Sequence, residues 1–385
     1  MNPQTGGPAQ AIINYLPHWQ AYGLDSYVVT LDDVAAPFVQ NERIIALGNA
    51  NNPWSYNKAL YAWLCKHLIE YDIVLVHGLW LYHGYAVLKA FKQLKKTNKK
   101  APKLYVMPHG MLDPYFQKAP ERKWKALRNT IYWHLIEKKL IQQADALLFT
   151  CEEEMVLAKD TFSSYHPKAT FNVGFGIEMP PAYTAEQANA FKEIASIQEN
   201  ESYILFLSRI HPKKGVDMLL KAYNQVFADI DNKNVSIPKL VIAGPGIETT
   251  YGEMLLQIVQ QSKFLQKQVI FTGMLVGNAK WGALYGCEAF VLPSHQENFG
   301  IAVAEALACS KPVLISDKIN IWREIELCHA GLINKDTISG VVELLQQWKG
   351  LSNNQKEDIC MRAREVYEKN FLMQNAAHNL LQAIC

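Results

Sequence analysis

Short apolar runs recur along the chain and alternate with longer segments of helical character. Continuous apolar runs of this kind are typical of parallel strands that helices cover on both faces. The first series of predicted strands comprises Ser26–Leu31, Ile44–Leu47, Ile73–Val76, Leu104–Met107, Ala146–Thr150 and Ala169–Val173. The second series comprises Tyr203–Leu207, Lys239–Ala243, Gln268–Phe271, Ala289–Leu292, Pro312–Ile315 and Gly331–Ile333. Two such series predict two doubly wound α/β halves.

A polar stretch from Met179 to Ser202 separates the two series. It begins with a Pro-Pro pair and continues as a helix-prone segment, so it is the predicted linker. We therefore expect an N-terminal domain over residues 1–180, a C-terminal domain over 181–365 and a final helix over 366–385. The length of 385 residues agrees with two domains.

Composition limits the class of protein. Apolar residues make up 49% and charged residues 19%, which excludes a disordered chain. The net charge of +2 gives no reason to expect nucleic acid as a partner. There is no apolar run of membrane-spanning length and no signal peptide at the start, so we expect a soluble, cytoplasmic protein. The seven scattered cysteines lack a C-x-x-C pair and indicate reduced thiols, and no cluster has the spacing of metal ligands.

Cations gather in the first half of the chain, in Lys89–Lys103 and Lys118–Arg128. The lysine run is either a solvated helix end with its loop, or a segment that attracts anionic lipid head groups or an anionic acceptor. The segment Trp124–Ile136 has an aromatic-rich face at helical spacing. That face belongs either to the core or an acceptor groove, or to peripheral contact with the inner face of the plasma membrane.

The segment SHQENFGIAVAEALA follows a predicted strand of the second half. Gly300 precedes an alanine-rich helix, whose free N–H groups and positive dipole end suit a phosphate. Glu297 lies in the loop, where it can reach ligand hydroxyls. Glu305 lies in the helix and can accept hydrogen bonds from a second set of hydroxyls, as acidic residues do for a ribose.

Further motifs lie at the same edge of the predicted sheet. Arg209 follows a strand directly, and Lys214 comes five residues later, so the two cations can clamp a diphosphate. Gly244 and Gly246 of AGPG, and the FTG turn at 271–273, are two more strand-to-glycine turns. Together these motifs predict a nucleotide-diphosphate site at the carboxyl ends of the strands.

At these residues the sequence resembles the family 4 glycosyltransferases, which are retaining enzymes of the GT-B fold that use nucleotide sugars. The blocks SR…KKG, AGPG, FTG and PSHQENFG…EALA fall in the family's order. The resemblance implies that Glu297 binds the hydroxyls of the donor sugar and Glu305 the ribose, with the cations on the diphosphate. It also implies donor contacts from Met274 and Leu275 on the base, and from Asn298, Phe299 and Gly300 near the sugar and phosphate. Asn298 departs from the family, which often has Gly there.

The first half carries the motif PHGMLDP. His109 follows a predicted strand and is either a structural histidine or a group that acts on a sugar hydroxyl or phosphate. The motif resembles the exopolysaccharide-synthesis branch of the family, which implies that His109 lies against the donor. Gly6 and Gly7 resemble the family's glycine loop facing the donor phosphates. Only five residues precede Gly6, so either the start is truncated or the first strand is missing or rudimentary.

These observations predict a GT-B protein with two Rossmann-like domains facing across a cleft, and a C-terminal helix that crosses back onto the N-terminal domain. The expected function is metal-independent, retaining transfer of a hexose by a front-face mechanism. UDP-glucose is the favoured donor, and a glycan or lipid-linked acceptor in cell-envelope or exopolysaccharide synthesis is expected. No cofactor beyond the nucleotide-sugar co-substrate is expected. The alternatives are a nucleotide-sugar epimerase and a non-catalytic nucleotide-sugar-binding protein of the same fold.

Overall fold

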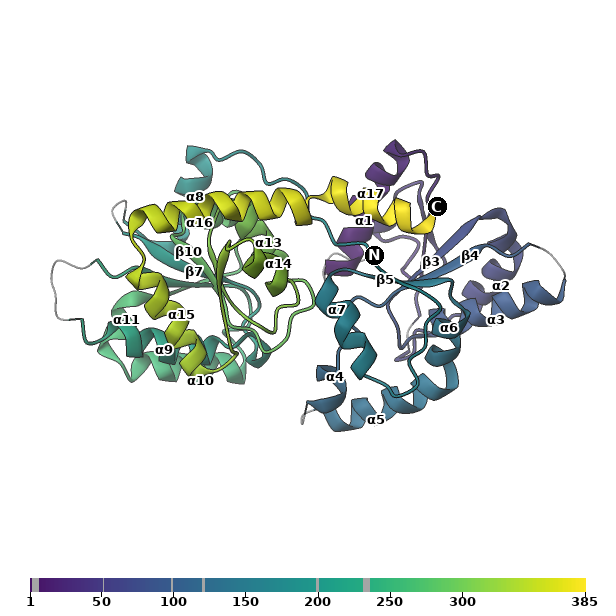
Figure 1. Ribbon diagram of the computed structural model, residues 1–385, viewed down its shortest axis with the longest axis horizontal. Helices are drawn as coiled ribbons and strands as arrows, with labels where there is room; N and C mark the ends of the chain where they lie inside the picture. The colour runs from purple at the N-terminus through teal and green to yellow at the C-terminus, as the bar shows by residue number, and fades with distance from the viewer. Residues whose placement is uncertain (2–6, 51, 98–99, 120–121, 199–200, 231–235) are drawn as a thin grey trace. The chain divides into compact units, whose positions relative to one another are not determined.

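The computed structural model describes residues 1, 7–50, 52–97, 100–119, 122–198, 201–230 and 236–385. The chain divides into two compact units (Figure 1). Unit 1 comprises Met1–Gly176 together with Met373–Cys385, and unit 2 comprises Ile177–Leu372. All of the apolar runs predicted as strands form strands, with ends shifted by at most two residues.

Unit 1 contains two parallel sheets. The larger has the order β3-β4-β5-β6, and the smaller pairs β1 with β2. The small pair has three-residue strands that are mostly half-buried, whereas β5 is buried along its whole length, as a central strand between helical layers must be. The strands of this unit are β1 (Val28–Thr30), β2 (Ile44–Ala46), β3 (Ile73–His77), β4 (Lys103–Met107), β5 (Ala146–Phe149) and β6 (Thr170–Asn172).

The core of unit 1 lies between its larger sheet and α2, α3 and α6. Helix α3 buries Phe91 and Leu94 and ends in exposed lysines, which complement the negative end of the helix dipole. The main helices are α1 (Gly7–Ala21), α2 (Lys58–His67), α3 (Tyr82–Lys96), α4 (Tyr115–Lys118), α5 (Lys123–Tyr132), π-helical η5 (Trp133–Glu137), α6 (Lys138–Gln143), α7 (Glu152–Leu157) and α17 (Met373–Ile384). Short 3-10 turns are η2 (Pro37–Val39), η3 (Leu68–Glu70) and η6 (Ala158–Asp160).

The C-terminal helix α17 packs on α1 within unit 1, as expected for a helix that crosses back (Figure 1). The Tyr105 hydroxyl donates a hydrogen bond to the Ile384 carbonyl at 3.1 Å, which ties the helix to the larger sheet. At the other end of the chain, Gly7 is the first residue of α1 rather than part of a loop after a strand. Gly6 lies outside the described residues.

Unit 2 has one six-stranded parallel sheet in the order β12-β11-β10-β7-β8-β9. Its central strands β7, β8, β10 and β11 are almost fully buried, because helices cover both faces. The strands are β7 (Tyr203–Leu207), β8 (Lys239–Ala243), β9 (Val269–Gly273), β10 (Ala289–Leu292), β11 (Val313–Ser316) and β12 (Gly331–Asn334).

Two helical layers enclose this sheet (Figure 1). One layer contains α9 (Val216–Phe227), α10 (Thr250–Gln260), α11 (Lys263–Gln268) and α15 (Ile338–Gly350). The other contains α8 (Ala185–Ala195), α12 (Gly277–Gly286), α13 (Ile301–Ala308) and α16 (Asn353–Val366). The remaining elements are η7 (Pro212–Lys214), α14 (Trp322–Leu327) and π-helical η8 (Tyr367–Phe371).

The segment expected to be a linker is an integral part of unit 2. A capping box between Thr184 and Gln187 begins α8. This helix packs backbone to backbone on α12, where a Cβ on Gly282 would lie only 2.0 Å from the Gln187 carbonyl oxygen. None of the helices in the described part of the chain has both the length and the apolar character needed to cross a bilayer.

Candidate functional site in unit 2

The strand order of unit 2 reverses between β7 and β10. In open α/β sheets, ligands bind beyond the carboxyl ends of the strands at such a switch point. The loop after β7 carries Arg209 and Lys214, and the loop after β10 carries Glu297. The Lys214 ammonium forms an ion pair with the Glu297 carboxylate. The fold therefore brings a predicted phosphate-binding cation and a predicted sugar-binding carboxylate together at this point.

Lys214 is a buried cation, with 7% of its surface exposed. Burial and the nearby cations Lys213 and Arg209 lower the pKa of Lys214 to about 7, whereas the carboxylate of Glu297 favours the charged ammonium. Arg209 itself is exposed. A dianionic ligand between Arg209 and Lys214 would favour the charged form of Lys214 in the same way as Glu297 does.

The glycines of AGPG let the loop after β8 approach the loop after β7. The Ser208 amide donates to the Ala243 carbonyl at 3.0 Å, next to Gly244. Gly244 has a φ of 144°, and a Cβ there would lie 1.9 Å from the Ser208 carbonyl oxygen. At Gly246, with φ of 115°, a Cβ would lie 2.5 Å from the carbonyl oxygen of Ile210. These glycines therefore have a structural role in addition to the predicted donor contact.

Glu297 is held by its backbone. Its amide donates to the Lys318 carbonyl at 2.9 Å, and its own carbonyl accepts from the Asn320 amide at 3.0 Å. These contacts form an isolated parallel bridge between Glu297 and Ile319. Gly300 has a φ of 78°, and a Cβ there would lie 3.1 Å from a methyl group of Ile319. The loop after β11 thus fixes both the carboxylate and the start of α13.

The amides of Ile301 and Ala302 precede the first hydrogen bond of α13, which the Val303 amide makes to the Gly300 carbonyl at 2.8 Å, so these two amides are suited to an anion. Phe299, just before this end, is buried with its ring 5.5 Å from that of Phe371 in an edge-to-face contact. Asn298 is half-buried in the same loop. The loop therefore presents helix amides and a carboxylate from one short segment.

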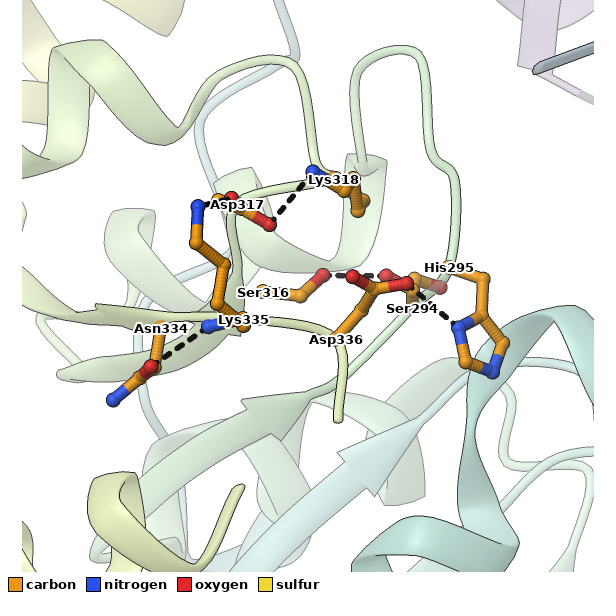
Figure 2. Close-up of polar contacts among 8 residues, drawn as sticks. All are labelled: Ser294, His295, Ser316, Asp317, Lys318, Asn334, Lys335 and Asp336. Atoms are coloured by element: carbon orange, nitrogen blue, oxygen red, sulfur yellow. Dashed lines mark hydrogen bonds and ion pairs between the residues drawn. The ribbon is translucent and has the colours of Figure 1, made fainter. Parts of the chain in front are cut away.

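Figure 2 shows how the loops after β10, β11 and β12 are joined through Ser294, His295, Ser316 and Asp336. His295 Nδ1 lies 2.9 Å from the Asp336 carboxylate, and the Ser316 hydroxyl donates to the Ser294 carbonyl at 2.5 Å. The His295 amide also donates to the Lys213 carbonyl at 2.8 Å. The loop that carries Glu297 is therefore tied to neighbouring loops on both sides.

Glu305 has a partner that the sequence did not reveal. Its Oε1 lies 2.6 Å from the ammonium of Lys280 on the neighbouring helix α12. The same ammonium lies 4.6 Å from the centre of the Trp281 ring, which favours a cation at this position. The site thus gains a second lysine–carboxylate pair.

The predicted base-contacting residues follow β9. Met274 is 68% exposed, whereas the Leu275 side chain is 6% exposed and packs into the unit. The Gly244 amide donates to the Gly273 carbonyl at 2.7 Å, so this turn continues the line of loops after β7 and β8. Met274 therefore lies exposed at the same edge of the sheet as the cations.

His109 lies in unit 1, after β4, with a φ of 52°. Its Nε2 lies 2.9 Å from Nδ1 of His77, which ends β3. Burial lowers the pKa of His109 to about 4, and burial together with His109 and His83 lowers that of His77 well below its usual value. Both rings are therefore neutral at pH 7, and one nitrogen of the pair donates to the other.

Glu154 fixes the turn that follows His109. This buried carboxylate accepts from the Gly110 amide at 2.5 Å, and from the amide and hydroxyl of Thr150 at 2.8 and 2.5 Å. It lies in an acidic run at the start of α7, which in sequence is typical of an exposed first turn. Within this run only Glu154 is buried, and the sequence alone does not show which of the three glutamates that is.

Unit 2 therefore combines cations, free helix amides and two carboxylates along one edge of its sheet. Residues 187–366 match the family model described as Glycosyl transferases group 1. The chain is 29% identical over 182 residues to an uncharacterized glycosyltransferase, MJ1607, of Methanocaldococcus jannaschii, covering 45% of this chain and 44% of that protein. It is 32% identical over 186 residues to an alpha-monoglucosyldiacylglycerol synthase of Streptococcus pneumoniae, covering 44% and 39%. The chain thus spans less than half the length of these relatives.

Solved structures match over almost the whole chain. Sucrose-phosphate synthase from Thermosynechococcus elongatus superposes with a TM-score of 0.72 at 19% identity, covering 98% of this chain and 92% of that one. Anabaena HepE in complex with UDP and glucose gives a TM-score of 0.72 at 15% identity, covering 98% and 95%. The fold is that of the GT-B glycosyltransferases, and residues 187–366 are similar to the Glycosyl transferases group 1 domain.

Proposed function

We propose that the protein is a retaining glycosyltransferase that moves a hexose from a nucleotide sugar, UDP-glucose first, to a glycan or lipid-linked acceptor in cell-envelope or exopolysaccharide synthesis. The observation that carries this proposal is the pairing of buried Lys214 with Glu297 at the switch point of the unit 2 sheet, beside the N-terminus of α13. A diphosphate needs the cation and the helix amides, and a sugar needs the carboxylate.

In this proposal Arg209, Lys214 and the α13 amides bind the diphosphate and stabilise the charge that develops on it. Glu297 accepts hydrogen bonds from the sugar hydroxyls, and Glu305 from those of the ribose. His109 of unit 1 is assigned to the donor by its motif, and its neutral ring can donate or accept a hydrogen bond. The bond between the anomeric carbon and the phosphate oxygen breaks, the acceptor oxygen bonds to that carbon on the same face, and the departing phosphate takes the acceptor proton. The anomeric configuration is retained, and these cations and dipoles supply the stabilisation without a metal ion.

Two comparisons support the choice of substrates. HepE, which shares the fold, was solved with UDP and glucose, and this favours UDP-glucose as the first donor to test. Relatives in Streptococcus pneumoniae and Acholeplasma laidlawii are named alpha-monoglucosyldiacylglycerol synthases, which favours trying lipid acceptors beside glycans.

The test is a transfer assay with UDP-glucose and separate lipid and polysaccharide acceptor fractions, with the product followed by NMR. We expect an α-linked product from the α-linked donor. Glu297→Ala should reduce transfer by a factor on the order of a hundred or more, because hydrogen bonds to the reacting sugar are lost. Glu357→Ala, at an exposed position on α16, is the matched control and should retain wild-type transfer.

An inverted product would contradict the mechanism, and wild-type transfer by Glu297→Ala would contradict the site. Isomerisation of the free donor without any acceptor would instead indicate the epimerase. Nucleotide-sugar binding with no reaction in any fraction would favour the non-catalytic binding protein.

A further inference from the structure

An exposed apolar stripe runs along the continuous helical segment formed by α5 and η5 in unit 1. Trp124, Leu127, Ile131 and Leu135 recur at spacings of three and four residues and therefore share one face. They are 85%, 53%, 54% and 61% exposed. The opposite face carries Asn129 and Trp133, which are buried. The segment therefore packs on unit 1 through that face and not through the apolar stripe.

Cations border this stripe. Lys123, Lys125 and Arg128 are exposed on α5, and Lys139 is exposed just beyond η5. Among the described residues from 122 to 143, the acidic side chain is Glu137, which is 0% exposed and does not reach the surface. The segment thus combines a large exposed apolar face with a uniformly basic border.

We propose that this stripe docks the protein on a membrane surface that contains anionic lipids, with the apolar side chains in the acyl boundary and the cations at the head groups. An amphipathic helix of this composition gains apolar burial and electrostatic attraction at the same surface. The inference concerns binding alone and does not depend on the proposed reaction.

Charge argues against a second copy of the chain as the occupant. A two-fold contact places the same patch on both partners, so it would bring the basic borders of two stripes together and add repulsion. A pocket of about 340 Å³ beside the stripe also fits a lipid surface. Its lining includes Gln117, Thr130, His134 and Ser163 next to Leu127, and these polar groups suit a head group.

The experiment is flotation of the full-length protein, without donor, on vesicles of phosphatidylcholine alone and of phosphatidylcholine with about one third phosphatidylglycerol. Partition onto the anionic vesicles should be strong at low salt and fall at roughly 0.5 M salt, where screening is short-ranged. Leu127→Ser combined with Ile131→Ser should lower it about tenfold or more. The matched control combines Leu327→Ser with Met361→Ser, which are 81% and 61% exposed in unit 2, and should bind as the wild type.

Lys123→Gln combined with Arg128→Gln provides a second test, and it should weaken binding to the anionic vesicles about fivefold per cation removed. Because every altered side chain is exposed, each variant should melt at the temperature of the wild type, and thermal melts verify this. The proposal would be overturned if the wild-type protein bound neutral and anionic vesicles equally well. It would also be overturned if the Leu127→Ser/Ile131→Ser and Lys123→Gln/Arg128→Gln variants both bound anionic vesicles as the wild type does. A dimer in light scattering that Leu127→Ser with Ile131→Ser dissociates, with no vesicle binding, would assign the stripe to self-association.

Discussion

The Lys280 ammonium donates a hydrogen bond to Oε1 of Glu305. It thereby orients the carboxylate that the proposed function assigns to the ribose. Lys280→Met keeps the aliphatic stem and removes the charge. We expect UDP to bind about tenfold more weakly, because the carboxylate loses a charge-assisted hydrogen bond that positions it. Binding of 2′,3′-dideoxyuridine diphosphate should change little, since it lacks the hydroxyls that Glu305 would accept. Calorimetric titration of both nucleotides measures this difference.

Lys263→Met, at an exposed position on α11, is the control for removing a lysine from unit 2 and should bind both nucleotides normally. Equal losses for UDP and the dideoxy nucleotide in Lys280→Met would show that Lys280 acts on the whole site rather than through Glu305.

The half-buried histidine pair predicts how unit 1 responds to acid. The pKa of His109 is lowered to about 4 and that of His77 lies well below its usual value, whereas both return to about 6.5 on unfolding. Below pH 6.5 the unfolded chain therefore binds more protons, and stability falls as the pH drops toward 4. Between pH 7.5 and pH 5, the free energy of unfolding measured in urea should fall by about 1–2 kcal/mol less in His109→Asn than in the wild type. Asparagine tolerates the positive φ of this position, and equal losses in both proteins would contradict the pKa direction.

At the scale of elements, the close approach of the loops after β7 and β8 makes Gly244 difficult to replace. A Cβ at this position would overlap the Ser208 carbonyl oxygen, at 1.9 Å, and the φ of 144° is unfavourable for other residues. Gly244→Ala should therefore lower the free energy of unfolding by about 2–4 kcal/mol, measured by denaturant titration. Gly350→Ala is the matched control, because no heavy atom lies within 4 Å of its added methyl group. Similar stabilities for the two variants would refute the backbone contact.

The same scale shows what sequence patterns can predict. Every predicted strand is present because each is a short apolar run of the kind that parallel sheets bury. The separation of β1 and β2 from the main sheet of unit 1 was not predictable, since a run such as Ile44–Ala46 does not specify its neighbour. The segment expected to be a linker begins close to the boundary between the units, but it contains α8, whose polarity resembles that of a linker and whose packing depends on Gly282, far along the chain.

At the scale of the whole molecule, the sequence located the motifs along one edge of unit 2 because parallel strands all end at that edge. It did not reveal the partners that orient these residues. Lys280 has no motif, Glu154 resembles an exposed acidic residue, and the contact of His77 with His109 depends on the pairing of β3 with β4. Such partners depend on tertiary packing between helices and strands that are distant in sequence.

The division into two units also predicts where a nucleotide should act. The cations, helix amides and carboxylates assigned to it all lie within Ile177–Leu372, so binding should stabilise unit 2. The melting temperature is measured with UDP, GDP, ADP, CMP and NAD, without added metal. We expect one of the three diphosphates to raise it by about 5–10 °C at 100 times its Kd. Arg209→Ala should abolish most of this shift, whereas Lys263→Ala should retain it.

Hydrogen exchange measured on the same samples locates the effect. Peptides that cover the ends of β7 and β10 should gain protection with the nucleotide, because opening of unit 2 then requires its release. Peptides from β4 and β5 of unit 1 should change less. Protection confined to unit 1, or no shift with any of the five nucleotides, would contradict the assignment of the diphosphate to Arg209 and Lys214. A shift with UDP alone would justify screening UDP-sugars as donors, because the base would then be known before the sugar.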